Sequence, residues 1–398
     1  MISLFVVQAT TRCNLNCAYC YLPVSSRRAF ERIPINVLNR ASALVLQSSL
    51  LSPTLSILWH AGEPLAAGIP FFEDAIQAIQ ANNIHAKQLG HSLQTNATLI
   101  NKRWCDFFAQ NEFDVGVSID GPEYLHNSRR VNWHGKGSFA ATMRGIECLQ
   151  ANGVKYSAIC VLTKDSLDYA DEIYDFFVEN GFSSIAFNVE EIEASNTSSS
   201  LLSDGETGII RHRYSLFMEQ LITRWVAAEG EIVIREFDSL ARKILAKKLF
   251  PNFVPMLDVS QGMQTITLRI DGSIVTFSPE LATGTVDDPD AFVVGHVDEL
   301  DELEDIYADA RYLKMRAEIK GGISKCREQC PYFGLCGGGW PSNKYAENGT
   351  FDSSETNNCL IHTKTLADVV LRLFTDRPEF VNAIQPYLHA ARNRVNVG

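Results

Sequence analysis

The sequence contains no block of basic residues and no long apolar run. Its 35 Lys and Arg residues are outnumbered by 47 Asp and Glu residues, which gives a net charge of −12 spread along the chain. Phosphate binding needs clustered Lys and Arg, so we expect no nucleic-acid partner. No apolar run approaches the ~20 residues of a membrane-spanning helix, so we expect no membrane partner. A signal-peptide pattern is also missing, because residues 1–3 lead directly into a predicted strand. We therefore expect a cytoplasmic protein.

The cysteine content is high for a chain expected in a reducing compartment. The 398 residues are 46% hydrophobic and 21% charged, which is ordinary for a globular protein with room for two domains. Ten cysteines in such a chain indicate metal or redox sites rather than disulfides. Cys105, Cys148 and Cys160 lie within apolar helix or strand patterns, and we expect them to pack in the core. The other seven fall into two groups.

The first group is Cys13, Cys17 and Cys20, which follow a short apolar run. Three thiolates delivered into one tight loop are suited to hold an iron–sulfur cluster. A [4Fe–4S] cube has four irons, so three cysteines leave one iron open to another ligand. A structural zinc site would need a fourth close ligand, and the nearest candidate, His60, lies forty residues further on.

The CxxxCxφC spacing of this loop, with Tyr19 as the aromatic residue, resembles the signature of radical S-adenosylmethionine (SAM) enzymes. The resemblance implies that the open iron chelates the amino and carboxylate groups of SAM. Transfer of one electron then cleaves SAM to methionine and a 5′-deoxyadenosyl radical. The protein orients this radical and shields it from side reactions. On this loop alone, a zinc or redox cysteine cluster is the alternative.

The pattern of residues 1–190 alternates short β-branched runs with segments of helical period. The predicted strands are 2–8, 55–60, 91–96, 114–120, 155–163 and 184–190. The predicted helices between them are 36–51, 71–84, 103–110, 139–150 and 167–180. Six such units predict an α/β fold with a parallel sheet and right-handed crossovers, matching the partial (β/α)6 TIM-like barrel of radical SAM proteins. We divide the chain into a core barrel (1–190), a helical bridge (191–255) and a C-terminal iron–sulfur domain (256–398).

Further motifs of the same family follow the predicted strands, where chemistry gathers in such folds. Ala61-Gly62-Glu63-Pro64 resembles the family's GGEP motif, whose loop and glutamate hold the SAM amino group. Gln94-Thr95-Asn96-Ala97 resembles its QTNG motif. In relatives, a serine and an arginine of the next stretch lie near the SAM carboxylate. The resemblance therefore implies a SAM site formed by Tyr19, Ala61, Gly62, Glu63, Asn96, Ser118 and Arg130, and it assigns no catalytic base.

The second group is Cys326, Cys330, Cys336 and Cys359, around a Gly-rich segment. It resembles the SPASM extension of radical SAM peptide-modifying enzymes, which holds two auxiliary clusters. Phe277 and Trp340 stand where relatives have cysteines of the first of these clusters. We therefore expect one auxiliary [4Fe–4S] cluster, closed by the four cysteines, with Phe277 and Trp340 filling the space of the lost one. A four-thiolate zinc site is the alternative.

The residues that differ from the family pattern also narrow the set of reactions that we expect. Ser278 stands where anaerobic sulfatase maturases carry an aspartate base, and serine is a poor base at neutral pH. A closed auxiliary cluster also offers no open iron to hold a substrate thiolate for thioether formation. We therefore expect a cyclophane-forming maturase, in which a side-chain Cβ of a ribosomal precursor peptide loses hydrogen and bonds to an aromatic ring.

Other readings remain open at this point. The alternatives within the family are a formylglycine-forming sulfatase maturase and a thioether-forming enzyme. A different class is a non-catalytic iron–sulfur protein for electron transfer or redox sensing. The expected partners of the enzyme are the precursor peptide and an electron donor, either a reductase or a flavodoxin or ferredoxin.

Overall fold

The fold is built on one ten-stranded sheet, seen in the computed structural model, which describes residues 1–202, 205–377 and 379–380. The strand order is β10-β9-β8-β1-β2-β3-β4-β5-β6-β7. The six central strands pair in parallel, each with the next. They are β1 (Ile2–Val7), β2 (Leu51–Trp59), β3 (Gln88–Thr95), β4 (Asp114–Ser118), β5 (Tyr156–Leu162) and β6 (Ser184–Val189). All six predicted strands are thus present, and β2 begins four residues before its predicted start.

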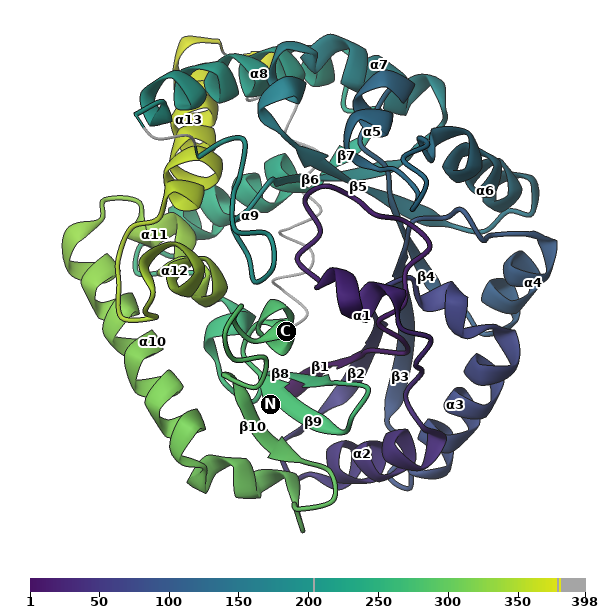
Figure 1. Cartoon of the computed structure of the whole chain (residues 1–398). Coiled ribbons are helices and arrows are strands. Elements are labelled where there is room, and N and C mark those ends of the chain that lie inside the picture. The colour runs from purple at the N-terminus through teal and green to yellow at the C-terminus, as the bar shows by residue number, and fades with distance from the viewer. Residues whose placement is uncertain (203–204, 378, 381–398) are drawn as a thin grey trace.

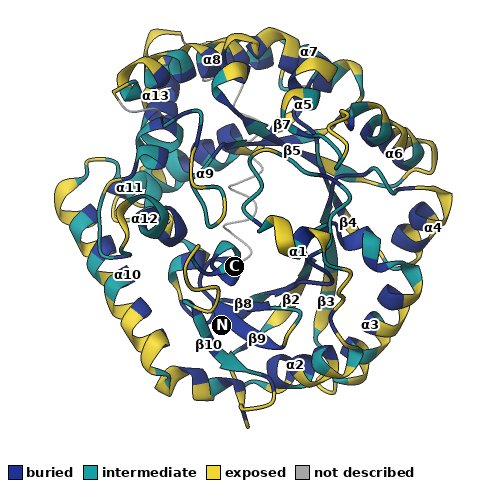
Figure 2. Ribbon diagram, viewed as in Figure 1, coloured by how far each residue is buried: buried dark blue, intermediate teal, exposed yellow. Residues whose placement is uncertain are grey.

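Helices follow these strands and cover the outside of the curved sheet (Figure 1). The main ones are α2 (Ile35–Gln47), α3 (Ile69–Ala81), α4 (Lys102–Gln110), α6 (Phe139–Ala151) and α7 (Ala170–Glu179), with short α5 (Glu123–Arg129) between α4 and α6 in the chain. The short α1 (Val24–Arg28) lies inside the ring instead. Each main helix buries one face and exposes the other (Figure 2), as a parallel sheet covered by crossover helices requires. The predicted helices are confirmed, with the ends shifted by a few residues.

The sheet extends past the six central strands on both edges. β7 (Val233–Ile234) adds in parallel to β6, while β8 (Thr265–Leu268) adds in parallel to β1. β9 (Ser273–Thr276) and β10 (Val293–His296) follow in antiparallel order. Within the described residues the edge strands β7 and β10 do not pair with each other, so the barrel is partial. The sheet therefore crosses the predicted boundaries at residues 190 and 255.

The remaining helices close the open side of the ring in Figure 1. They are α8 (Thr207–Ala227), α9 (Arg235–Leu249), α10 (Ala310–Gln329), α11 (Phe333–Cys336), α12 (Pro341–Asn348), a π-helix (Cys359–Thr365) and α13 (Leu366–Asp376). Short 3₁₀ turns lie at Pro64–Ala67, Lys164–Asp168, Asp258–Ser260, Pro279–Thr283 and Leu303–Ala308. The Tyr214 hydroxyl on α8 lies 2.8 Å from Nδ1 of His362, which ties the C-terminal helices to the bridge. None of the described helices is both long and apolar enough to span a membrane.

Aromatic rings fill the core between the sheet and α3 and α4. Phe72 contacts Trp59 at 5.0 Å and Trp104 at 5.6 Å between ring centroids, with edge-to-face geometry. Phe107 and Phe113 lie within 6.2 Å of the same ring. Such contacts add about 0.5–1.5 kcal/mol per pair to the burial of the rings. This packing fixes the strands β2 to β4, whose ends carry the predicted motifs.

Helix α6 packs closely on the turn that follows β3. The Thr142 hydroxyl donates to the Asn96 carbonyl oxygen at 3.1 Å. A Cβ atom at Gly145 would lie 2.0 Å from the Ala97 carbonyl oxygen, which is backbone and cannot give way easily. Glycine at this position therefore sets how near the helix comes to the Asn96 turn.

We predict that Gly145→Ala lowers the free energy of unfolding by about 2 kcal/mol or more, because the added methyl group overpacks the contact. Gly208→Ala is the matched control, since nothing lies within 4 Å of a Cβ atom there in helix α8. That variant should be neutral or more stable by up to about 1 kcal/mol. Urea unfolding measures both, and equal stability of the two variants would contradict the packing argument.

Candidate functional site

The three cysteines of the first group lie in the loop after β1, which crosses the interior of the ring (Figure 1). Backbone bonds hold this loop on both flanks. The Cys13 amide donates to the Arg27 carbonyl at 2.9 Å, and the Ala18 amide donates to the Arg129 carbonyl at 2.8 Å. Cys13, Cys17 and Cys20 all line one cavity of about 280 Å³.

Six of the seven predicted SAM-binding residues line the same cavity. They are Tyr19, Ala61, Gly62, Asn96, Ser118 and Arg130. They come from the segments that follow β1, β2, β3 and β4, so the parallel sheet gathers them at the carboxyl ends of its strands. The side-chain nitrogen Nδ2 of Asn96 lies 3.8 Å from Sγ of Cys13, and this contact joins the predicted cofactor residues to the cysteine loop.

The side chain of the seventh residue, Glu63, points into the protein interior and not into the cavity. Its side chain is fully buried, and its carboxylate accepts bonds from the Leu65 amide at 3.1 Å, the Thr95 hydroxyl at 2.7 Å and the Asn96 amide at 2.8 Å. Its own amide donates to the Arg12 carbonyl at 2.7 Å. Glu63 therefore joins the ends of β2 and β3 to the cysteine loop, and the cavity wall near it consists of Ala61 and Gly62.

The turn before Glu63 passes so near the cysteine loop that it requires glycine. A Cβ atom at Gly62 would lie 2.6 Å from the carbonyl oxygens of Thr10 and Arg12, and φ at Gly62 is +62°. Ala61 also has a left-handed φ of +75°, and Ala97 has φ of +61°. Both alanines thus adopt the conformation of the glycines that the family motifs have there, at a cost of about 1–2 kcal/mol each.

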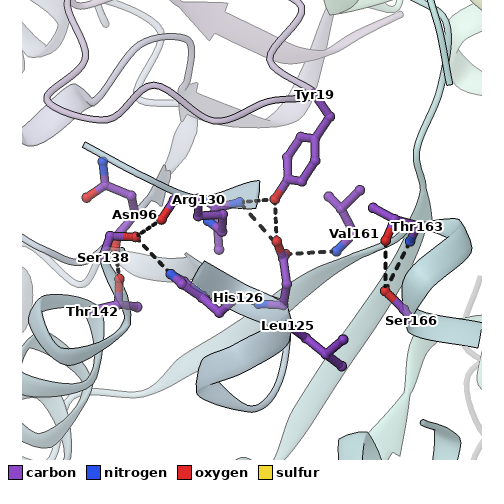
Figure 3. Close-up of polar contacts among 12 residues, drawn as sticks. Tyr19, Asn96, Leu125, His126, Arg130, Ser138, Thr142, Val161, Thr163 and Ser166 are labelled. Atoms are coloured by element: carbon purple, nitrogen blue, oxygen red, sulfur yellow. Dashed lines mark hydrogen bonds and ion pairs between the residues drawn. The ribbon is translucent and has the colours of Figure 1, made fainter. Parts of the chain in front are cut away.

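Arg130 lines the cavity and keeps one guanidinium donor without a partner among the described residues. Its Nη1 donates to the Tyr19 hydroxyl at 2.6 Å, and that hydroxyl donates to Asp120 at 2.5 Å (Figure 3). The Ser138 hydroxyl donates to the Arg130 carbonyl oxygen at 2.8 Å, and it lies 2.9 Å from Nε2 of His126. Among the described residues, Arg130 Nε is buried and has no hydrogen-bond partner. A guanidinium donor in this state fits an anionic group such as a carboxylate.

Burial disfavours the thiolate form of these three cysteines. Burial raises the pKa of Cys13 to about 12, with the charge of Glu63 adding to the rise. Burial also raises the pKa of Cys17 and of Cys20. Iron–sulfur ligation needs thiolates, so cluster binding at this loop releases protons. The three thiols, the close turn at Gly62 and the free donor of Arg130 together fit an iron–sulfur cluster with an amino-acid ligand.

Comparison with known proteins agrees with this geometry. The family model described as the radical SAM superfamily matches residues 7–177. The chain is also 30% identical over 255 residues to a cysteine-type anaerobic sulfatase-maturating enzyme of Clostridium perfringens (strain 13 / Type A), covering 62% of this chain and 67% of that enzyme. The chain belongs to the radical SAM superfamily. Members use a [4Fe–4S] cluster and SAM, which are therefore the cofactors of this protein.

Other relatives cover more of the chain. An uncharacterized protein of Synechocystis sp. (strain ATCC 27184 / PCC 6803 / Kazusa) is 38% identical over 373 residues, 93% of this chain and 91% of that protein. The structure of anSMEcpe with bound AdoMet has a TM-score of 0.77 at 22% identity, covering 98% of both chains. Streptococcus suis SuiB bound to its precursor peptide SuiA has a TM-score of 0.61 at 18% identity, covering 90% of this chain and 76% of that chain. These two structures share the fold of the radical SAM protein described here.

The second cysteine group comes together near the C-terminal helices. Burial is the largest of the effects that raise the pKa of Cys326, and the neighbouring Cys336 and Cys330 add to the rise. Burial and Cys336 likewise raise the pKa of Cys359. In the described part of the chain, no three Cys, His, Asp or Glu side chains lie close enough to hold a single metal ion. Four thiolates on one Zn²⁺ would lie about 3.8 Å apart, given Zn–S bonds of about 2.3 Å.

A buried lysine accompanies this group. Lys344 is 3% exposed, and its ammonium group donates to Sγ of Cys326 at 3.4 Å. Among the described residues it forms no ion pair with a carboxylate. A buried ammonium group needs an anionic partner, which favours Cys326 as a thiolate and thus as a metal ligand. No sequence motif marked this lysine, because it lies outside the cysteine spacing.

The two residues that replace family cysteines behave differently. Phe277 is 1% exposed, and its ring stacks on Tyr312 at 5.7 Å. It fills apolar space, as predicted. Trp340 is 46% exposed, so the prediction that it fills the space of a lost cluster is wrong. The physical reason is that Trp340 directly precedes helix α12, at the rim of a cavity rather than in its interior.

Four carboxyl side chains of the cavity were missed by the sequence analysis. Glu190, Glu191, Glu193 and Glu280 line it beside the cysteine loop. Oε1 of Glu193 and Oε2 of Glu280 are buried, with no hydrogen-bond partner among the described residues. Burial, and then the charges of Glu280 and Glu191, raise the pKa of Glu193 well above its usual value. No motif marked them, because Glu191 and Glu193 precede a polar loop and Glu280 lies in a 3₁₀ turn.

We predict that Glu63→Ala lowers both stability and SAM affinity. Two backbone amides and a hydroxyl lose a buried acceptor, so the free energy of unfolding should fall by about 2–4 kcal/mol. SAM affinity should fall about tenfold, because the Gly62 turn is no longer held. A Glu63 that contacted only the SAM amino group would give an affinity loss without a stability loss.

Urea unfolding and equilibrium binding of SAM to the reconstituted protein separate these outcomes. Glu73→Ala, on the exposed face of α3, is the matched control and should leave both quantities unchanged.

Proposed function

We propose that this protein is a radical SAM peptide maturase that forms a carbon–carbon crosslink between a side-chain Cβ and an aromatic ring of a precursor peptide. The observation that carries the proposal is the position of the carboxyl groups. Ser278, at the place of the sulfatase-maturase base, is fully buried and does not line the cavity. Glu190 also lines the cavity, but its carboxylate accepts bonds from the amide and hydroxyl of Ser200. The other carboxyl groups there are those of Glu191, Glu193 and Glu280, which suit deprotonation of a crosslinked product.

The cysteine loop and the cavity wall have separate tasks in this proposal. When bound, the cluster and SAM supply the 5′-deoxyadenosyl radical that removes a hydrogen atom from the substrate. Cys13, Cys17 and Cys20 hold the cluster, Gly62 lets the backbone come close to SAM, and Arg130 Nε donates to the SAM carboxylate. The cavity walls exclude water from this chemistry.

The shape of the surrounding space supports a peptide substrate. Glu280 lines three adjoining cavities, of which one continues past Glu193 toward α12 and another continues past Glu191 toward α9. An extended chain could therefore reach the cysteine loop along these cavities. The sulfatase-maturating relative and the structure of SuiB with its precursor peptide are consistent with a polypeptide substrate.

The crosslink balances when one hydrogen atom, one electron and one proton leave. The hydrogen atom leaves the substrate Cβ, which then bonds to the aromatic ring. Restoring the aromatic ring releases one proton and one electron. We assign the proton to Glu280, whose Oε2 has no partner among the described residues. Cys326, Cys330, Cys336 and Cys359 would hold an auxiliary [4Fe–4S] cluster, which would supply an acceptor for the electron before it passes to an external acceptor.

A sulfatase maturase is the second candidate, favoured by the match to the Clostridium perfringens enzyme. It would convert a cysteine or serine side chain to an aldehyde, which also needs a base in the cavity. Glu280 is available for that role too, so the product decides between the two candidates.

We predict that co-expression with its precursor peptide gives a product about two mass units lighter per crosslink. Fragmentation should show a segment that no longer breaks between an aromatic residue and a nearby partner. Glu280→Gln should still form 5′-deoxyadenosine but yield about 10²-fold less product, because the proton acceptor is lost. Glu179→Gln, exposed on α7, is the control and should match wild type. An aldehyde-reactive product would contradict the crosslink and support the maturase.

Metal content tests the cluster assignment independently of any substrate. We predict about eight irons per chain after anaerobic reconstitution, as two [4Fe–4S] clusters. The Cys13/Cys17/Cys20→Ala variant should keep about four irons, and the core variant Cys105→Ala should keep about eight. Iron analysis of the purified proteins measures this. Twelve irons, or zinc at the C-terminal cysteines, would show that the four-cysteine assignment is wrong.

A further inference from the structure

The cysteine loop separates two cavities. Cys13 and Leu15 line the SAM cavity, and the same two residues line a second cavity beside α1. The segment 13–15 is therefore a thin wall, with one side toward the proposed substrate space and the other toward this second cavity. Arginine and aromatic side chains dominate the second cavity, notably Arg12, Arg28 and Trp133.

The face around the second cavity is basic in an acidic protein. Residues 1–30 and 124–146 contain no Asp or Glu, although the chain has a net charge of −12. Arg12 and Arg28 form no ion pair with any residue that the structure describes. Their guanidinium groups lie on aromatic rings instead, Arg12 at 4.0 Å from the Phe30 centroid and Arg28 at 4.6 Å from that of Trp133. Lys136 is exposed in the turn that follows Trp133.

The same face has an apolar centre. Phe30 is 75% exposed, and Val24 on α1 is 52% exposed. Trp133 connects this face to the cluster loop, because its indole nitrogen donates to the Cys13 carbonyl oxygen at 2.9 Å. Exposed aromatic side chains rimmed by unpaired cations are the composition of a protein-binding surface with an acidic partner. We name this face, made of Arg12, Val24, Arg28, Phe30, Trp133 and Lys136, the basic face.

We propose that the basic face docks a small acidic electron-carrier protein, which delivers one electron to the cluster held by Cys13, Cys17 and Cys20. The inference rests on the cluster site and not on the identity of the peptide product. One electron passes from the reduced carrier to the cluster, and no bond or proton changes hands in that step. The wall formed by Cys13 and Leu15 lets the carrier approach the cluster without entering the substrate space. A free carrier can therefore bind while a peptide occupies the other side.

The test compares two charge-reversal pairs that change the net charge equally. Arg28→Glu/Lys136→Glu reverses two charges on the basic face. Arg103→Glu/Lys155→Glu reverses two charges at exposed positions elsewhere, where neither residue forms an ion pair with any residue that the structure describes. The probe is an acidic bacterial flavodoxin in its hydroquinone state, and dithionite serves as the small reductant. Stopped-flow absorbance follows cluster reduction in the reconstituted full chain. Isothermal titration calorimetry measures the affinity for flavodoxin.

In the basic-face variant, the second-order rate of reduction by flavodoxin should fall at least about tenfold at low salt, with a similar loss of affinity. Reduction by dithionite should equal wild type in both variants, which also shows that the cluster is intact. The control pair should keep most of the flavodoxin rate, and the wild-type rate should fall with added salt.

Three results would overturn the proposal: equal losses in both variants, a wild-type rate independent of salt, or no reduction of wild type by flavodoxin. A loss of precursor-peptide binding with an unchanged flavodoxin rate would assign the face to an acidic peptide segment and overturn it as well. Should Arg28→Glu impair folding, Arg28→Gln/Lys136→Gln removes the charges without reversal and should slow the same reaction. Failure of the crosslink assay would leave these rates unaffected, so the two proposals fail separately.

Discussion

The buried carboxylate of Glu63 is the constraint on which the site depends. It accepts two backbone amides and a hydroxyl from the ends of β2 and β3, while the Glu63 amide binds the cysteine loop. A charge buried this deeply is tolerated because its oxygens are used in hydrogen bonds. The consequence is that three strand ends and the cluster loop hold one geometry. Gly62 can then pass within contact distance of the loop backbone, and Asn96 reaches Cys13.

The charges of the molecule are arranged on the two sides of that loop. On the inner side, the carboxyl groups of Glu191, Glu193 and Glu280 lie in the cavity near the cysteines. On the outer side, the basic face carries arginines without carboxylate partners among the described residues. An electron entering from outside and a substrate entering from inside would thus meet at the same loop without competing for space. The backbone bonds that clamp the loop keep the wall between them thin.

The sequence predicted the strands, the main helices and the gathering of the cysteines with six of the seven residues predicted to bind SAM. It did so because the parallel sheet places every strand end at one edge, so motifs far apart in the chain converge there. It could not predict the direction of Glu63, since the motif fixes its position but not whether its carboxylate faces the cavity or the protein. Glu280 and Lys344 were missed because their surroundings come from segments distant in sequence. Trp340 was misplaced because hydrophobicity alone does not show whether a ring precedes a helix at a rim or packs in a core.

The central claim is that the loop of Cys13, Cys17 and Cys20 binds a cluster that cleaves SAM in the cavity described. The most direct measurement is 5′-deoxyadenosine formed by the reconstituted, dithionite-reduced protein with SAM under anaerobic conditions. The account predicts formation by wild type and by Cys105→Ala, and none by the Cys13/Cys17/Cys20→Ala variant, which should still fold. Retained 5′-deoxyadenosine formation in the triple variant, or its absence in iron-loaded wild type, would contradict the account.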